Sequence, residues 1–110
     1  MSGDAPYPRA AHSMEYKDDY IWIFGGNNNF EFFNDIHRFN ITNNTWEFVN
    51  YTQNPNNPVP RAGHTMILFD DIFLIYGGGD SSQFFDHLYF FDLKECSFQL
   101  KHTKVLWIIE

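Results

Sequence analysis

Apolar positions along the chain fall into short runs that recur at a fixed distance. The stretches Tyr20–Phe24 and Ile72–Tyr76 are each apolar for five consecutive residues, and a pair of glycines follows each of them. A short continuous apolar run that ends at turn residues is typical of a strand covered on both faces. We therefore predict two buried strands whose positions differ by 52 residues.

The same shift relates most of the chain to itself. It aligns residues 8–48 with residues 60–100 without a gap, and 13 of the 41 aligned pairs are identical. Self-similarity at a period near 50 residues predicts an array of equivalent units. The predicted organisation is a lead-in over residues 1–7, units over 8–50 and 60–102, an Asn- and Pro-rich linker loop over 51–59, and a divergent apolar tail over 103–110.

Each unit carries the signals of four strands joined by tight turns. The first strand has mixed polarity and ends at an Asp pair, Asp18-Asp19 or Asp70-Asp71, which is typical of a hairpin turn. No segment has a convincing 3.6-residue period, so we expect an all-β chain of two four-stranded antiparallel meanders. Besides the two buried strands, the expected strands are 12–16, 64–68, 36–41 and 88–93, with fourth strands that start near Trp46 and Phe98.

The repeated double glycine has a structural explanation. A strand buried on both faces needs a sheet on either side, and radial packing of four-stranded sheets in a β-propeller supplies this arrangement. Where such a strand ends, the chain must turn away in little space, and glycine allows a positive φ and has no Cβ. We expect this role for Gly25, Gly26, Gly77 and Gly78.

The combined motif of the two units resembles a known repeat. Each unit reads Pro-Arg-x-x-His, an apolar strand, Gly-Gly, an Asn or Asp before the third strand, and an aromatic residue after a polar turn. This pattern resembles the kelch repeat, although in the second unit His87 replaces the acid and Phe98 replaces the usual Trp. The motif residues are Arg9, His12, Gly25, Gly26, Asn34, Asp35, Phe39 and Trp46, then Arg61, His64, Gly77, Gly78, Asp86, Phe91 and Phe98.

The resemblance implies kelch-type β-propeller blades and a function in protein–protein interaction. A minority of the family are enzymes such as the galactose-oxidase group, so a fragment of a copper or sugar-processing enzyme is one alternative, and a non-functional truncated product is another. Two blades do not close a propeller, which takes typically four to eight. We therefore expect an incomplete propeller: a fragment, a truncated product, or a chain that self-associates through its open blade faces.

Composition and charge narrow the function further. The net charge is −7 and the seven Lys and Arg residues are scattered, which argues against nucleic acid or a membrane surface as partner. Cys96 is the only cysteine, so an internal disulfide and a multi-cysteine metal site are excluded. The polar N-terminal stretch lacks the apolar core of a signal peptide, so we expect a cytoplasmic protein, with the nucleus as an alternative.

Candidate catalytic and metal-binding groups have simpler structural explanations. His12 and His64 occupy equivalent positions, which favours a packed structural role over metal ligation, since a metal site needs several converging donors. The Asp pairs offer too few oxygen ligands for Ca²⁺. Cys96 lies in a predicted turn beside Glu95, whose charge disfavours the thiolate. We expect no enzyme activity, no cofactor and no bound metal.

Long loops on one face of the meanders are predicted to bind a partner. The connections 27–34 and 79–86 and the linker 50–60 should all emerge on that face, and loops on a rigid scaffold commonly carry binding function. We expect Phe32, Phe33, Phe84 and Phe85 to fold inward, and the tail 105–109 to add an edge strand. The predicted contact residues are Asn28, Phe30, Glu31, Tyr51, Gln53, Asp80, Ser82 and Gln83, with Arg9 and Arg61, for which tying one blade to the next is the alternative.

Overall fold

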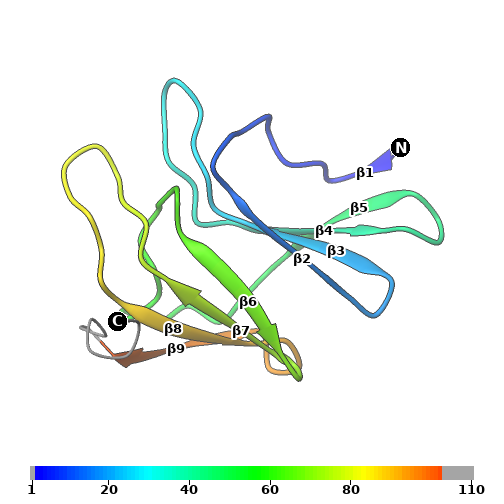
Figure 1. Ribbon diagram of the computed structural model, residues 1–110. Helices are drawn as coiled ribbons and strands as arrows, with labels where there is room; N and C mark the ends of the chain where they lie inside the picture. The colour runs from blue at the N-terminus through cyan, green and yellow to red at the C-terminus, as the bar shows by residue number, and fades with distance from the viewer. Residues whose placement is uncertain (1, 103–110) are drawn as a thin grey trace.

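The computed structural model describes residues 2–102, which form two β-sheets that we call the first and second blade (Figure 1). No helix occurs in this part of the chain, so the prediction of an all-β fold with two four-stranded meanders is confirmed. The expected edge strand at 105–109 lies outside the described residues. The first blade contains β2 (Ser13–Lys17), β3 (Tyr20–Phe24), β4 (Ile36–Asn40) and β5 (Thr45–Val49), and the second contains β6 (Thr65–Phe69), β7 (Ile72–Tyr76), β8 (Leu88–Asp92) and β9 (Ser97–His102).

The predicted strands agree with the observed ones to within one residue at their ends. The apolar strands β3 and β7 have the expected bounds, whereas β2 and β6 each begin and end one residue later than predicted. In the first blade Asp18 and Asp19 both have positive φ, 54° and 67°, so they form the whole two-residue hairpin turn and Lys17 still belongs to the strand. The Asp pair therefore marks the turn as predicted.

The lead-in contains a short strand that the sequence did not indicate. β1 (Ser2–Gly3) pairs in parallel with β5 at the outer edge of the first blade. The amide of Asp4 continues the pairing, since it donates to the carbonyl of Trp46 at 3.1 Å. A strand of two residues is too short to carry any alternation, which is why the pattern of apolar positions could not predict it.

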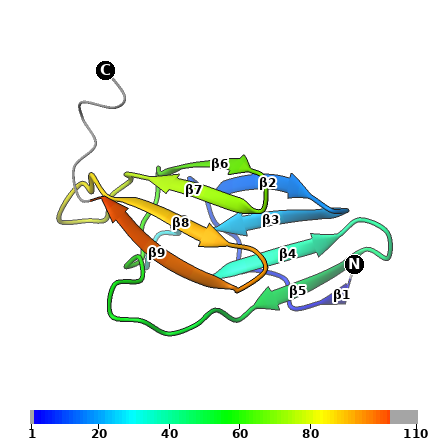
Figure 2. The same ribbon diagram turned by 90° about the horizontal axis from the view of Figure 1, so that it is seen from below.

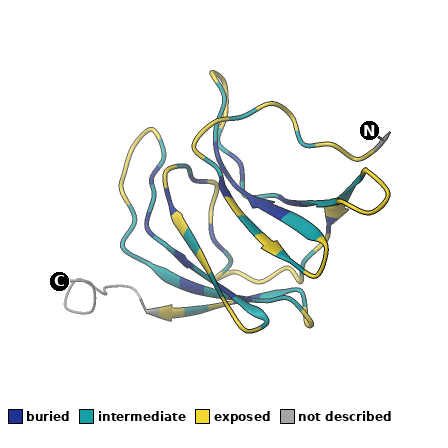
Figure 3. Ribbon diagram, turned by 45° about the vertical axis from the view of Figure 1, so that its right-hand side comes forward, coloured by how far each residue is buried: buried dark blue, intermediate teal, exposed yellow. Residues whose placement is uncertain are grey.

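The hydrophobic core lies between the two blades. Figure 2 shows the sheets facing each other, with β2 and β6 side by side as the innermost strands. The rings of Trp22 and Phe73 meet across this interface with centroids 5.6 Å apart, and those of Phe24 and Phe98 lie 5.7 Å apart. Figure 3 shows the buried positions along the strands where the blades face each other, and exposed hairpin turns. Each blade is therefore stabilised by burial against the other.

The glycine pairs at the ends of β3 and β7 have the predicted positive φ, but the space around them differs between the two blades. A Cβ on Gly25 would lie 2.8 Å from Cε1 of His64 and 2.9 Å from the carbonyl oxygen of Arg61, both in the second blade. In contrast, of the residues that the structure describes, a Cβ on Gly77 would meet only Phe85, at 3.5 Å from its carbonyl oxygen. All four positions require a left-handed backbone that favours glycine: φ is 70° at Gly25, 100° at Gly26, 76° at Gly77 and 83° at Gly78.

Each blade also has an outer face that the other blade does not cover. Because side chains alternate along a strand, the residues next to the buried ones point outward. We call the outer face of the first blade the head face (Met14, Tyr16, Ile21, Ile23 and Phe39) and that of the second blade the tail face (Ile67, Phe69, Leu74, Tyr76 and Phe90).

No helix long and apolar enough to span a membrane is found among residues 2–102.

Candidate functional site

The loops that follow β3 and β7 project from the same end of the molecule (Figure 1), as the meander topology predicts. Single antiparallel bridges close each loop at its base, between Asn27 and Phe32 in the first blade and between Gly79 and Phe84 in the second. We call this end of the molecule the loop face. It brings together segments from both repeats, so a partner could contact the two blades at once.

Side-chain hydrogen bonds hold the tips of both loops. Oδ1 of Asn28 accepts from the amides of Phe30 and Glu31, each at 2.8 Å. At the equivalent position in the second loop, Oδ1 of Asp80 accepts from the amides of Ser82 and Gln83 at 2.9 and 3.1 Å. These bonds, the Ser82 amide first, lower the pKa of Asp80. Asn28 and Asp80 therefore order their own loops, and the exposed side chains of Glu31, Ser82 and Gln83 lie on the surface that results.

Two phenylalanine rings stand out from these loops. Phe30 is 93% exposed and Phe84 is 95% exposed. The prediction that Phe84 folds inward is wrong, whereas Phe33 is buried as predicted. Neighbouring residues of an extended chain point in opposite directions. Here Phe85 turns inward, and Cζ of Arg61 lies 4.1 Å from the centroid of the Phe85 ring. Phe84 must then point into solvent.

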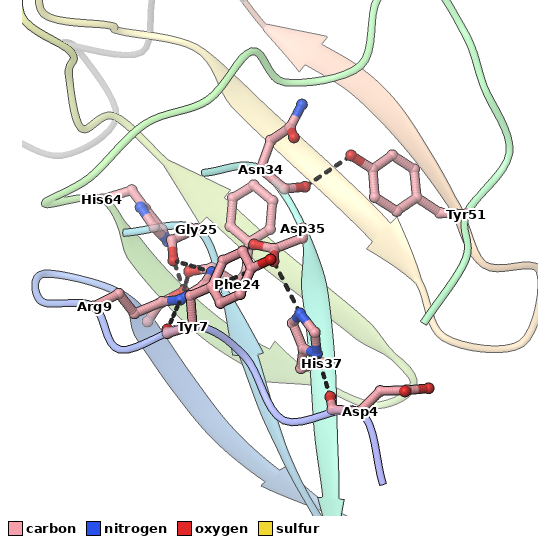
Figure 4. Close-up of polar contacts among 11 residues, drawn as sticks. Asp4, Tyr7, Arg9, Phe24, Gly25, Asn34, Asp35, His37, Tyr51 and His64 are labelled. Carbon is pink, nitrogen blue, oxygen red and sulfur yellow. Dashed lines mark hydrogen bonds and ion pairs between the residues drawn. The ribbon is translucent and has the colours of Figure 1, made fainter. Parts of the chain in front are cut away.

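Tyr51 of the linker contributes to the contact between the blades. Its hydroxyl donates to the carbonyl of Asn34 at 2.8 Å (Figure 4), and its ring packs edge-on against Phe98 with centroids 4.9 Å apart. Burial, followed by the charge of Asp35, raises the pKa of the Tyr51 hydroxyl. Gln53 is exposed and donates to the carbonyl of Tyr51 at 3.3 Å. Of these two predicted contact residues, Gln53 is the one on the surface.

Arg9 lies in a network inside the first blade (Figure 4). Its guanidinium group binds Asp35 through two hydrogen bonds, of which Nη2 to Oδ2 measures 3.0 Å, and it also donates to the carbonyl of Gly25 at 3.1 Å. Nε2 of His37 lies 2.9 Å from Oδ2 of the same carboxylate. Burial by itself would raise the pKa of Asp35, but the hydrogen bonds from His37 and Arg9 and their charges lower it to about 2.

Arg61 occupies the equivalent place in the second blade but has no carboxylate partner among residues 2–102. The residue that corresponds to Asp35 is His87. Arg61 is 0% exposed, and its guanidinium group donates to the carbonyls of Val59 and Gly77 at 3.0 and 3.2 Å. Nη2 of Arg61 and Nδ1 of His87 are buried without a hydrogen-bond partner among the described residues. Arg9 and Arg61 are both enclosed by protein, which does not fit direct contact with a partner. Their guanidinium groups bind Asp35 and Gly25 in the first blade, and Val59 and Gly77 at the second, so these side chains do not tie one blade to the next.

His64 has a structural role at the interface between the blades. Its Nε2 lies 2.6 Å from Oγ of Ser13 in the first blade, and its ring packs edge-on against Phe24 at 5.0 Å. Burial lowers the pKa of His64 to about 4, so the imidazole is neutral at pH 7. Within residues 2–102 no group of three or more His, Cys, Asp or Glu side chains gathers as a metal site would require. The aromatic motif residue Trp46 packs against Phe39, with centroids 5.1 Å apart.

The geometry defines a class of protein. Two four-stranded meanders, packed face to face with their first strands side by side and Gly-Gly turns at one end, are neighbouring blades of a β-propeller. Residues 1–105 match the family model described as the KLHDC2/KLHL20/DRC7 Kelch-repeats domain. The chain belongs to the kelch-repeat family, whose domains generally act in protein–protein interaction. The resemblance of the motifs to kelch repeats is thus confirmed.

Curated relatives contain this region as a small part of a longer chain. Acyl-CoA-binding domain-containing protein 5 of Arabidopsis thaliana is 35% identical over 72% of this chain and 12% of its own length. Tip elongation aberrant proteins 3 and 1 of Schizosaccharomyces pombe are 35% and 34% identical over 83% and 86% of this chain. The aligned region spans 8% of each of these two proteins.

Proposed function

We propose that the chain binds a protein partner through its loop face, with Phe30 and Phe84 as the main contact residues. The observation that supports this is the exposure of both rings, 93% and 95%, on adjacent loops of a kelch domain. Aromatic side chains in the centre of an interface commonly contribute most of the binding energy. The kelch family's general role in protein interaction favours this function over the catalytic alternative.

The loops are suited to this role because they are ordered in advance. The hydrogen bonds to Asn28 and Asp80 fix each loop tip, so little conformational entropy is lost when a partner binds. The polar groups around the two rings come from Glu31, Ser82 and Gln83, together with Gln53 of the linker. The surface fits a partner that offers apolar pockets with hydrogen-bonding groups at their edges.

The proposal is tested with peptides selected from a displayed library on the immobilised wild-type chain. We expect Phe30→Ala and Phe84→Ala each to weaken the binding of a selected peptide by about 30-fold or more, because truncation of a central aromatic residue that dominates an interface costs about 2 kcal/mol or more. Affinity is measured by biolayer interferometry, and thermal melts should stay unchanged because both rings are exposed.

The matched control is Ile41→Ala, which removes another exposed apolar side chain, at the opposite end of the first blade and outside the head and tail faces. This variant should bind the selected peptides as the wild type does. Selected peptides that bind the Phe30→Ala/Phe84→Ala double variant with unchanged affinity would show that the partner site is elsewhere.

A further inference from the structure

The two blades are connected by backbone hydrogen bonds as well as by apolar side chains. The amide of Gly26 donates to the carbonyl of Arg61 at 2.9 Å, and the amide of Arg61 donates to the carbonyl of Phe33 at 3.1 Å. A third bond runs from the amide of Gly63 to the carbonyl of Ala11 at 2.9 Å. The segment that enters the second blade is thus paired with the end of the first blade. We call this connection the joint.

The second blade has the equivalent backbone donor and acceptor, but no described residue forms a hydrogen bond with them. The counterparts of Gly26 and Phe33 are Gly78 and Phe85, and within residues 2–102 neither the Gly78 amide nor the Phe85 carbonyl has a hydrogen-bond partner. Both residues border a hollow of about 560 Å³, which Thr65, Tyr76 and the loop residue Phe84 line on the second blade and Ala11 and Phe32 line on the first. A Cβ on Gly77 would have room there, whereas one on Gly25 would clash with the second blade. Among the described residues, none takes in the second blade the place that Arg61 takes in the first.

The chain also carries the complementary half of the joint. Arg9 is the counterpart of Arg61, and in the part of the chain that the structure describes its backbone amide and carbonyl have no hydrogen-bond partner. The carbonyl of Gly63 and the amide of Ala11 are likewise unpaired there. One end of the molecule therefore presents the groups that the other end needs.

Side chains on the two outer faces correspond in the same way. At the joint, the imidazole of His64 contacts the hydroxyl group of Ser13. The counterpart of His64 is His12 on the head face, and the counterpart of Ser13 is Thr65 on the tail face, so the same two chemical groups are present. Trp22 of the first blade packs on Phe73 of the second. The counterpart of Trp22 is Leu74 on the tail face, and the counterpart of Phe73 is Ile21 on the head face. Burial of such apolar surface favours association.

We propose that a second copy of this chain docks its head face on the tail face, so that the joint between the blades is repeated between two chains. The inference does not depend on the loop-face function. Such a contact is heterologous, and heterologous contacts close into rings when the rotation allows it. Since propellers close with typically four to eight blades, the ring contains two to four copies.

Three charge substitutions test the proposal in size-exclusion chromatography with light scattering. Leu74→Glu alters the tail face, and Met14→Glu alters an exposed residue of the head face whose counterpart Met66 packs on the core. Ile67→Glu is the matched control on the tail face, because its counterpart at the joint is already a glutamate, Glu15, whose Oε2 accepts from the Leu68 amide at 3.0 Å.

The wild type and Ile67→Glu should elute as one assembly of two to four times the chain mass of 13.1 kDa. Leu74→Glu and Met14→Glu should each be monomeric with wild-type circular dichroism. When these two variants are mixed, one unaltered head face meets one unaltered tail face, so a 1:1 dimer should form. A monomeric wild type would overturn the proposal. So would equal disruption by Ile67→Glu and Leu74→Glu, or folded variants that form no dimer on mixing.

Discussion

Two arginines at equivalent positions have different electrostatic surroundings. Arg9 is neutralised by Asp35, while Arg61 is fully buried with His87 in the place of the acid. Phe85 covers the Arg61 guanidinium group and carbonyl groups bind part of it, but Nη2 remains without a partner among the described residues. Burial lowers the pKa of Arg61, which is the sign of a charge that is poorly stabilised in the folded state. In the described part of the chain, Arg61 thus lacks the ion pair that Arg9 forms with Asp35.

Replacing His87 with aspartate should stabilise the protein. In His87→Asp a carboxylate would stand where Asp35 binds Arg9, and a hydrogen bond to a charged group contributes about 1.5–3 kcal/mol. We expect a rise of roughly this size in the free energy of unfolding, measured with urea at pH 7 and one fixed protein concentration. His87→Asn, which adds no charge, should gain less. Asp35→His should lower stability, because it leaves Arg9 without its carboxylate. Equal stability of wild type and His87→Asp would contradict this account of Arg61.

The identities of the residues at the loop face could be predicted, but their directions could not. The Asn- and Phe-rich loops were located from the repeat, and Phe30 was included among the contact residues. The assignment failed at Phe84, because Phe84 and Phe85 are chemically identical neighbours and only packing over Arg61 decides which one is buried. The burial of Arg61 itself also depends on the contact between the blades, which a local pattern does not contain.

At the scale of elements, the two glycine pairs differ in what surrounds them. Gly25 and Gly77 share a positive φ, 70° and 76°, so a side chain is strained at either position. Only Gly25 is also enclosed by His64 and Arg61 of the following blade. The same local sequence thus has a filled environment at the end of β3 and an open one at the end of β7.

Alanine at these two positions should therefore have unequal costs. Both Gly25→Ala and Gly77→Ala should lose about 1–2 kcal/mol from the left-handed backbone. Gly25→Ala should lose roughly 1–3 kcal/mol more, because its Cβ forces the blades apart. Urea unfolding in the Leu74→Glu background, which keeps the chain monomeric, measures the difference. If both variants lose the same stability, the contact between Gly25 and the second blade is not as close as described.

Strands were predicted well because their signals are local. Continuous apolar runs fixed β3 and β7, and the Asp pairs located the turns before them. The strand β1 was missed because it is defined by pairing with β5 and not by any pattern of its own. Features that depend on contact between distant segments are the ones that a single sequence leaves open.

At the scale of the whole molecule, stability depends on the interface between the blades, which contains the neutral His64. Its pKa is about 4 in the folded state and about 6.5 when solvated, so the unfolded chain binds more protons between these values. The stability that neutral His64 allows is present above pH 6.5 and is lost as the pH falls toward 4. Asp35, whose folded pKa is about 2 against 3.8 for the free group, extends the loss from about pH 4 to pH 2.

Urea unfolding as a function of pH should show this dependence. One proton accounts for about 1.4 kcal/mol per pH unit, so the free energy of unfolding should fall at up to this slope between pH 6.5 and pH 4. His64→Asn, which carries no titratable group, should be less stable at pH 7 and should lack this phase. A wild-type stability that is constant from pH 7 to pH 4.5 would mean that His64 is not buried as a neutral group.

The order of the two halves of the joint along the chain has a consequence for synthesis on the ribosome. The groups that receive Arg61 belong to Gly26 and Phe33, which precede it in the chain. The first blade ends with β5 at Val49, so its sheet can form before Arg61 leaves the ribosome. We therefore expect the strands of the first blade to be available for pairing first, and its apolar face to become buried when the second blade emerges and packs on it.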